Sequence, residues 1–160
     1  MKIAVCPGSF DPVTLGHLDI IERASELFDR VVVLVMTNSA KHCAFTVEER
    51  IALLKKCVCN PKVEIDTYSG LLINYAKEKG AVAIVKGLRA VSDFDYEFQQ
   101  ALINKSLFPG IETVFLTARS ENMFLSSSMV KEVCSLDGDI SPFVPKEIVK
   151  DIYLRCKGDN

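Results

Sequence analysis

The feature that most constrains the fold of this chain is an alternation of short apolar runs with helical patterns. The runs are rich in Val and Ile and mostly lack polar alternation, as is typical of strands covered on both faces. They predict strands at Lys2–Cys6, Arg30–Met36, Val63–Thr67, Ala83–Lys86 and Thr113–Leu116. Helices are predicted near His17–Phe28, Val47–Cys57, Leu71–Lys79, Asp93–Phe108 and Ser127–Leu136. Such alternation indicates a parallel sheet with right-handed crossovers.

The predicted fold class is therefore α/β: a single doubly wound, Rossmann-like domain over residues 1–160 with a five-stranded parallel sheet and a C-terminal helix. Local signals mark the helix ends. Thr46-Val47-Glu48-Glu49 has the pattern of a capping box, and Lys79-Gly80 is a plausible helix stop. Pro145 is expected to begin the terminal helix, because proline suits the first helical position.

Composition excludes several classes of function. With 19 basic and 21 acidic residues and no run of like charges, the chain is not expected to bind nucleic acid. The longest wholly apolar run, Val31–Met36, is too short to span a bilayer, and no signal peptide is visible, so we expect a cytoplasmic protein without membrane contact. The six cysteines lack zinc-site spacing and are expected to be free, mostly buried thiols.

The segment Gly8–His17 follows the first predicted strand and leads into the first helix. In a doubly wound sheet this turn opens onto the crevice where nucleotides bind. A phosphate can approach closely over glycine, and the amides at a helix start add donors and partial positive charge. His17 can contribute a ring N–H. The segment is therefore interpreted as a phosphate-binding loop with one potentially catalytic donor.

Further anion-binding groups follow other strands. Lys86 and Arg89 flank Gly87 after the fourth strand, Ser126-Ser127-Ser128 opens the helix after the fifth, and Lys41 lies on the loop after the second. Each has an ordinary explanation by itself, as a solvated charge, an ion-pair partner or a helix cap. If the first and fourth strands flank the reversal of strand order, these loops share one crevice. Their coincidence at equivalent strand ends favours a binding site for a polyanion.

Several segments together resemble one family. Thr14-Leu15-Gly16-His17 matches the T-x-G-H motif of the nucleotidylyltransferase superfamily, and Phe124–Ser128 resembles its second, serine-containing motif. The chain is most similar to the phosphopantetheine adenylyltransferase family, over nearly its whole length. The matching segments are Pro7–Pro12, Phe45–Arg50, Gly87–Ala90 and Ser126–Glu132. The resemblance implies transfer of the adenylyl group of ATP to 4′-phosphopantetheine, giving dephospho-coenzyme A and pyrophosphate.

The resemblance also implies residue roles. The catalytic group would comprise His17, Lys41 and Arg89. The ATP-binding positions would be Ser9, Phe10, His17, Gly87, Leu88, Arg89, Glu97, Asn122, Met123, Phe124, Leu125, Ser126, Ser127 and Ser128. The substrate-binding positions would be Ser9, Lys41, Leu72 and Lys86. Mg²⁺ would be held mainly by phosphates rather than by protein ligands, and the assembly would be a homo-hexamer.

Two positions depart from the family's frequent residues. Ser9 stands where threonine is frequent and keeps the hydroxyl group, whereas Lys86 stands where arginine is frequent and keeps the charge without the bidentate fork. Alternatives also remain at this point. Another nucleotidylyltransferase, acting on nicotinamide mononucleotide or glycerol phosphate, would share the histidine motif and the fold. A nucleotide sensor would bind ATP without chemistry, although binding alone scarcely requires His17.

Overall fold

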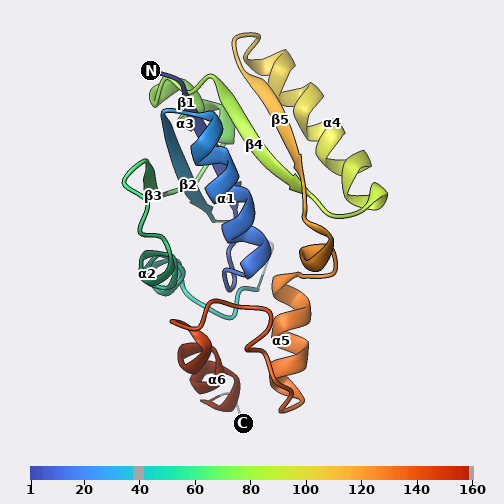
Figure 1. Cartoon of the computed structure of the whole chain (residues 1–160). Coiled ribbons are helices and arrows are strands. Elements are labelled where there is room, and N and C mark those ends of the chain that lie inside the picture. Colours follow the sequence, from blue (N-terminus) through green and yellow to red (C-terminus); the bar gives the residue numbers. More distant parts are fainter. Residues whose placement is uncertain (38–41, 159–160) are drawn as a thin grey trace.

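The computed structural model describes residues 1–37 and 42–158, and its centre is a parallel sheet of five strands (Figure 1). The strands are β1 (Ile3–Gly8), β2 (Arg30–Met36), β3 (Val63–Tyr68), β4 (Ala83–Leu88) and β5 (Glu112–Thr117). Their order across the sheet is β3-β2-β1-β4-β5, and every neighbouring pair is parallel. The predicted α/β class and all five strands are confirmed, with boundaries that differ by at most two residues.

The helices also lie where the sequence predicts them, with one exception. They are α1 (Leu15–Leu27), α2 (Val47–Cys57), α3 (Leu72–Glu78), α4 (Val91–Leu107), α5 (Ser127–Ser135) and α6 (Val149–Gly158), with a short 3₁₀ helix, η1, at Ser120–Asn122. The predicted start of the terminal helix at Pro145 is wrong. The Pro145 carbonyl accepts a hydrogen bond from the Ile148 N–H at 3.1 Å, which closes a separate turn. Val144 and Ile148 are buried on either side, so packing fixes the turn and the helix begins after it.

The sheet carries an apolar layer on each face. On β2, Val31, Val33 and Val35 pack with residues of α1, α2 and α5, whereas Val32 and Leu34 pack with residues of α3 on the opposite face. Successive side chains of a strand point to opposite faces, so both sets must be apolar when both faces are covered. This explains why the β2 sequence lacks polar alternation. No helix in the described ranges is long and apolar enough to cross a membrane.

The position of the site follows from the strand order. The chain builds β1, β2 and β3 toward one edge of the sheet and then returns to add β4 and β5 on the other side of β1. The strand order therefore reverses between β1 and β4, which meets the condition set by the sequence analysis for the loops after these strands to meet at one edge of the sheet. A Cβ at Gly87 would lie 3.0 Å from the Ile20 side chain, so glycine allows α1 to pack closely over β4.

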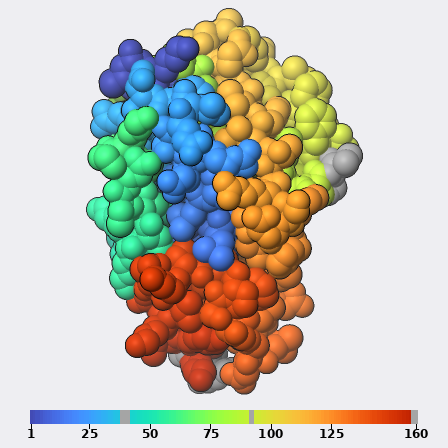
Figure 2. Space-filling view, in the orientation of Figure 1, coloured from blue at the N-terminus to red at the C-terminus, as the bar shows by residue number. Residues whose placement is uncertain are grey.

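The C-terminal segment covers one end of the molecule, where the space-filling view shows it next to α1 and α2 (Figure 2). The backbone N–H of Leu15 donates to the carbonyl oxygen of Phe143 at 3.0 Å, and Lys56 of α2 pairs with Asp151 of α6 at 2.8 Å. A disulfide between Cys134 and Cys156 joins α5 to α6. These contacts fasten the C-terminal segment to α1, α2 and α5.

The disulfide corrects the expectation that all cysteines are free thiols. Cys134 and Cys156 are 22 residues apart in the chain, but the packing of α6 on α5 brings their Cα atoms within 6.3 Å. The spacing of the residues carries no sign of that contact. The remaining cysteines among the described residues are free thiols, and of these only Cys6 is buried. The expectation that the thiols are mostly buried is therefore also wrong.

Candidate active site at the carboxyl ends of β1 and β4

The turn between β1 and α1 ends in a helix cap that the sequence analysis did not identify. Thr14 is the N-cap of α1, and its Oγ1 accepts a hydrogen bond from the backbone N–H of His17 at 3.3 Å. In return, the backbone N–H of Thr14 donates to Nδ1 of His17 at 3.0 Å. This is a capping box in which histidine replaces the usual Glu or Gln. The cap fixes the imidazole at the first turn of α1.

The same hydrogen bond sets the protonation of the ring. Because Nδ1 accepts from Thr14, the proton of the neutral imidazole resides on Nε2. Burial lowers the pKa of His17 from its ordinary value of 6.5 to about 4, and the positive charge of Arg89 acts in the same direction. At neutral pH the ring is therefore uncharged and offers a hydrogen-bond donor at Nε2.

An aromatic contact supports the imidazole from the strand side. The ring of Phe10 lies edge-on to that of His17, with 5.1 Å between centroids and 66° between planes. Phe10 is only 2% exposed and has a φ of 49°, an uncommon backbone conformation for a residue with a side chain. A Cβ at Gly8 would come within 2.9 Å of the Phe10 ring. Glycine at the end of β1 therefore makes room for the ring that holds His17.

Arg89 enters the site from the end of β4. Its Nη1 donates to the carbonyl oxygen of Leu125 at 2.8 Å, and its Nε donates to Oδ2 of Asp93 at 3.2 Å. The first contact ties the guanidinium to the segment just before α5, and the second restrains it from α4. The positive charge of Arg89 helps to lower the pKa of His17, so the guanidinium is near enough to act on the imidazole electrostatically.

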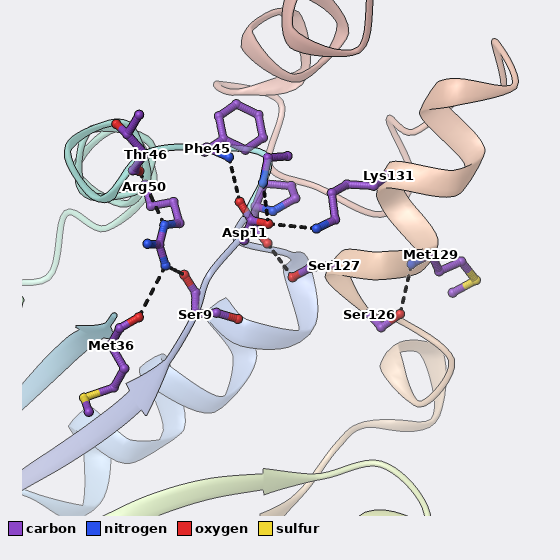
Figure 3. Close-up of polar contacts among 12 residues, drawn as sticks. Ser9, Asp11, Met36, Phe45, Thr46, Arg50, Ser126, Ser127, Met129 and Lys131 are labelled. Atoms are coloured by element: carbon purple, nitrogen blue, oxygen red, sulfur yellow. Dashed lines mark hydrogen bonds and ion pairs between the residues drawn. The ribbon is translucent and has the colours of Figure 1, made fainter. Parts of the chain in front are cut away.

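The N-terminus of α5 joins the β1–α1 turn directly. Ser126 is the N-cap, and its Oγ accepts from the backbone N–H of Met129 at 3.1 Å. Ser127 Oγ donates to the carbonyl oxygen of Pro12 at 2.7 Å (Figure 3). The first backbone N–H groups of a helix lack intrahelical partners and carry partial positive charge. The serine segment and the histidine loop therefore lie against each other at this edge of the sheet.

Lys86 and Glu97 face each other across the β4–α4 connection. Lys86 Nζ lies 3.1 Å from Glu97 Oε2, and each side chain is 22% exposed. Within the described part of the chain, that buried oxygen has an ion-pair contact but no partner in hydrogen-bond geometry. A phosphate group near Lys86 would compete with Glu97 for the ammonium group.

Arg50 is a buried site residue that sequence reasoning did not single out. It lies on α2 and is 3% exposed, and its Nη1 donates to the carbonyl oxygen of Ser9 at 2.7 Å and that of Met36 at 3.5 Å (Figure 3). The guanidinium thereby links the ends of β1 and β2 and fixes the backbone at Ser9. An arginine in an otherwise ordinary amphipathic helix carries no local signal for partners so distant in sequence.

The other predicted residues are less closely grouped. Gly87 and Leu88 end β4, Asn122 ends η1, Met123 and Phe124 are exposed beyond it, Leu125 is buried, and Ser128 is in the first turn of α5. Leu72 begins α3 at the same edge of the sheet, but β3, which precedes it, is separated from β1 by β2. Lys41 lies outside the described residues. The structure therefore brings together the groups on the β1, β4 and β5 loops and leaves Leu72 to one side.

Comparison with known proteins adds family evidence to this geometry. The model of the cytidylyltransferase-like family matches residues 5–133. A phosphopantetheine adenylyltransferase from Alkaliphilus metalliredigens is 55% identical over 152 residues, which cover 94% of this chain and 96% of that protein. A phosphopantetheine adenylyltransferase from Thermotoga neapolitana is 51% identical over 156 residues, covering 97% of each.

Solved structures agree on the fold. A putative nicotinate-nucleotide adenylyltransferase from Vibrio parahaemolyticus matches 96% of this chain and 93% of its own, with a TM-score of 0.69 and 18% identity. The Plasmodium falciparum nicotinic acid mononucleotide adenylyltransferase complexed with NaAD matches 96% of this chain and 95% of its own, with a TM-score of 0.70 and 16% identity. At such identity these likenesses establish the shared Rossmann-like architecture alone.

Proposed function

The chain belongs to the phosphopantetheine adenylyltransferase family, and from that membership we infer its reaction: ATP and 4′-phosphopantetheine give dephospho-coenzyme A and pyrophosphate. The observation in the structure that best supports this chemistry is the orientation of His17. Its Nδ1 is used by the helix cap, which leaves the Nε2–H for a ligand beside Arg89 and the start of α5. Such a donor suits the α-phosphate, where charge develops as pyrophosphate departs.

The reaction needs no general base from the protein. A phosphate monoester has a second pKa of about 6 and is mostly a dianion at neutral pH, so it is already nucleophilic. The remaining difficulty is to bring two anions together and to release pyrophosphate, and positioning and charge neutralisation address both. We assign His17 to the α-phosphate, and Arg89 with the Ser127–Ser128 start of α5 to the β- and γ-phosphates.

The acceptor is assigned to the opposite side of the α-phosphate. Lys41 and Lys86 would bind the attacking phosphate, and Leu72 would form part of an apolar wall for the pantetheine arm. The pairing of Lys86 with Glu97 supports a site in which the lysine exchanges a carboxylate for a phosphate when substrate binds. The remaining ATP-binding positions, including Glu97, keep the roles that the family resemblance gives them.

Mg²⁺ fits this site through the nucleotide. Among the described residues, no group of three or more His, Cys, Asp or Glu side chains is placed to hold a metal ion. The nearby carboxylates of Asp11, Asp93 and Glu97 are each paired with a Lys or Arg side chain. We therefore propose that phosphate oxygens of ATP hold the ion, where it would neutralise charge on the departing pyrophosphate.

A homo-hexamer forms part of the proposal. Support comes from the exposed apolar side chains on α4, which include Phe94, Phe98, Leu102, Ile103 and Leu107. A large exposed apolar patch of this kind marks an interaction surface. Light scattering should give six times the 17.7 kDa chain mass, and Phe98→Glu should lower it. A monomeric parent protein would contradict this part of the proposal.

A cytoplasmic location is proposed because the inferred reaction consumes ATP. Fractionation of cells that express the chain at its natural level tests this location. Recovery in the cytosolic fraction is the expected result, and recovery in an envelope fraction would contradict it.

A pyrophosphate-release assay with three acceptors tests the function. ATP with 4′-phosphopantetheine should release pyrophosphate, whereas ATP with nicotinamide mononucleotide, or CTP with glycerol phosphate, should not. Release with nicotinamide mononucleotide alone would move the chain to a different acceptor class. Tight ATP binding without release for any acceptor would identify a nucleotide sensor instead.

A further inference from the structure

One buried carboxylate connects three segments that border the site. Asp11 is 3% exposed, and its Oδ1 accepts from the backbone N–H of Phe45 at 2.9 Å. Its Oδ2 accepts from the backbone N–H of Ala44 at 3.0 Å and from Nζ of Lys131 at 2.7 Å (Figure 3). Asp11 is in the β1–α1 turn, Ala44 and Phe45 precede α2, and Lys131 is on α5. A single side chain therefore ties the turn to both neighbouring segments.

The carboxylate is held in its charged form. Burial by itself would raise the pKa of Asp11, but the hydrogen bonds from Lys131, Ala44 and Phe45 outweigh it and lower the pKa below its ordinary value. An ion pair with one buried partner is weak evidence for stability, because apolar residues of similar size often stabilise a fold as well. What such a pair supplies is geometry: each bond has a defined length and direction.

The geometry that Asp11 fixes is that of the candidate active site. Within the same turn, Phe10 precedes Asp11 and packs on the His17 ring, and Pro12 follows it and accepts the Ser127 hydroxyl hydrogen bond. The Asp11–Lys131 bond and the Ser127–Pro12 bond thus join α5 to the histidine loop at two points about one helical turn apart on α5. Two joints fix the relative orientation of the segments, whereas one would leave a pivot.

We propose that Asp11 is a positioning residue for adenylyl transfer, which sets the placement of the α5 N-terminus relative to His17. This proposal rests on the function inferred above. Asp11 touches no reacting atom in this scheme. It aligns the group assigned to the α-phosphate with the groups assigned to the β- and γ-phosphates, and a misplacement of about 1 Å can lower a rate by about 10²-fold.

The test substitutes Asp11→Asn, which keeps the size of the side chain but removes the charge and one acceptor. In the folded variant, kcat for dephospho-coenzyme A formation should fall by about 30- to 100-fold, because alignment matters most in the transition state. The dissociation constant for ATP, measured by calorimetry, should change by less than about threefold because the phosphate-binding groups remain. A folded variant with kcat within about threefold of the parent would overturn the proposal.

A matched control is available in the same molecule. Lys56 and Asp151 form another lysine–aspartate pair that joins two helices, at 2.8 Å, away from the proposed ligand groups. Asp151→Asn removes a carboxylate in the same way and should leave kcat unchanged. Equal losses of kcat in both variants would indicate a general effect on the fold and would overturn a specific role for Asp11.

Lys131→Gln provides a second route if Asp11→Asn does not fold. This variant keeps the bonds from Asp11 to Ala44 and Phe45 and removes only the link to α5. Its kcat should fall by about tenfold, and the double variant with Asp11→Asn should be no slower than Asp11→Asn alone. A normal kcat for Lys131→Gln would overturn the proposal. An inactive parent enzyme would instead refute the proposed function.

Discussion

Two helices of this chain begin with the same reciprocal cap, in which the N-cap threonine and the third helical residue bond to each other. That third residue differs between the two helices. At α1 the cap joins Thr14 and His17, and at α2 it joins Thr46 and Glu49. In both, threonine Oγ1 accepts the third-position backbone N–H at 3.3 Å. The second bond of each cap is donated by the backbone N–H of the threonine. It is 3.0 Å long to Nδ1 of His17 and 2.8 Å long to Oε2 of Glu49. The local geometry is nearly the same, so the functional difference must come from the side chain.

The two side chains differ in the hydrogen-bonding atoms that remain free after the cap has formed. Glu49 accepts with Oε2 and pairs through Oε1 with Arg155 of α6, so both of its oxygens hold the fold together. An imidazole accepts at one nitrogen and donates at the other. Capping with Nδ1 therefore fixes where the Nε2–H points. One substitution converts a common structural motif into an oriented hydrogen-bond donor.

The largest effect is expected when the α1 cap is changed to resemble the α2 cap. His17→Glu keeps an acceptor for the Thr14 N–H but removes the donor, whereas His17→Ala removes both. Turnover should fall by about 10²–10³-fold in each variant, because a transition-state donor is lost. Unfolding in urea should show His17→Ala about 1 kcal/mol less stable than His17→Glu, because only the latter can cap.

The controls for this pair are ATP binding and turnover. ATP binding should stay measurable in His17→Ala, because the proposed contacts from Arg89 and α5 remain. Near-normal turnover in either variant would reject the assigned role of His17.

A smaller effect is expected from the other partner of the cap. Thr14→Val fits the buried site, since Thr14 is 2% exposed and valine has the same shape. The backbone N–H of residue 14 still donates to Nδ1. However, the acceptor for the His17 N–H and the Oγ1 contact to Nδ1 at 3.1 Å are both lost, so the ring is less well oriented. We expect turnover about tenfold lower. Steady-state kinetics measure it, and a 10²-fold loss would show that Thr14 does more than orient the ring.

The fold was predictable from the sequence because its signals are local and repeated. Each strand is a short Val- and Ile-rich run, and covering on both faces removes polar alternation, so β2 was placed with both boundaries correct. The Thr46–Glu49 cap was recognised because glutamate at that position is the common pattern. The parallel order then placed the loops after β1, β4 and β5 at one edge.

What the sequence did not reveal depends on tertiary contacts or unusual residue choices. The cap at Thr14–His17 was missed because histidine is not the residue usually sought at its third position. Arg50 binds the Ser9 carbonyl from 41 residues away, which no local pattern encodes. The start of α6 and the Cys134–Cys156 bond likewise depend on how the C-terminal segment packs.

The depressed pKa of His17 predicts that the stability of the fold depends on pH. The folded state holds the imidazole neutral down to about pH 4, whereas the unfolded chain protonates it near 6.5. Between these values the unfolded state binds more protons, so this group's contribution to stability falls as the pH decreases and is fully present above about 6.5.

Urea unfolding at several pH values measures this contribution. In His17→Gln the glutamine can cap the helix but does not titrate. The stability advantage of the parent over His17→Gln should therefore shrink as the pH falls from 6.5 toward 4. The comparison cancels the carboxylates that both proteins share. A constant difference across that range would mean that the folded His17 titrates at its ordinary pKa.

The smallest expected effect comes from Thr46→Ala, which removes the ordinary cap. The N–H of Glu49 loses its side-chain acceptor, so α2 should be destabilised by about 1 kcal/mol. Turnover at a temperature where the variant is fully folded should equal that of the parent. The Thr46–Glu49 capping box stabilises the start of α2 and offers no hydrogen-bond donor to a ligand. If turnover fell as it does in Thr14→Val, both caps would control the site through the loops they anchor. The Nε2–H donor of His17 would then explain less of the functional difference between the two caps.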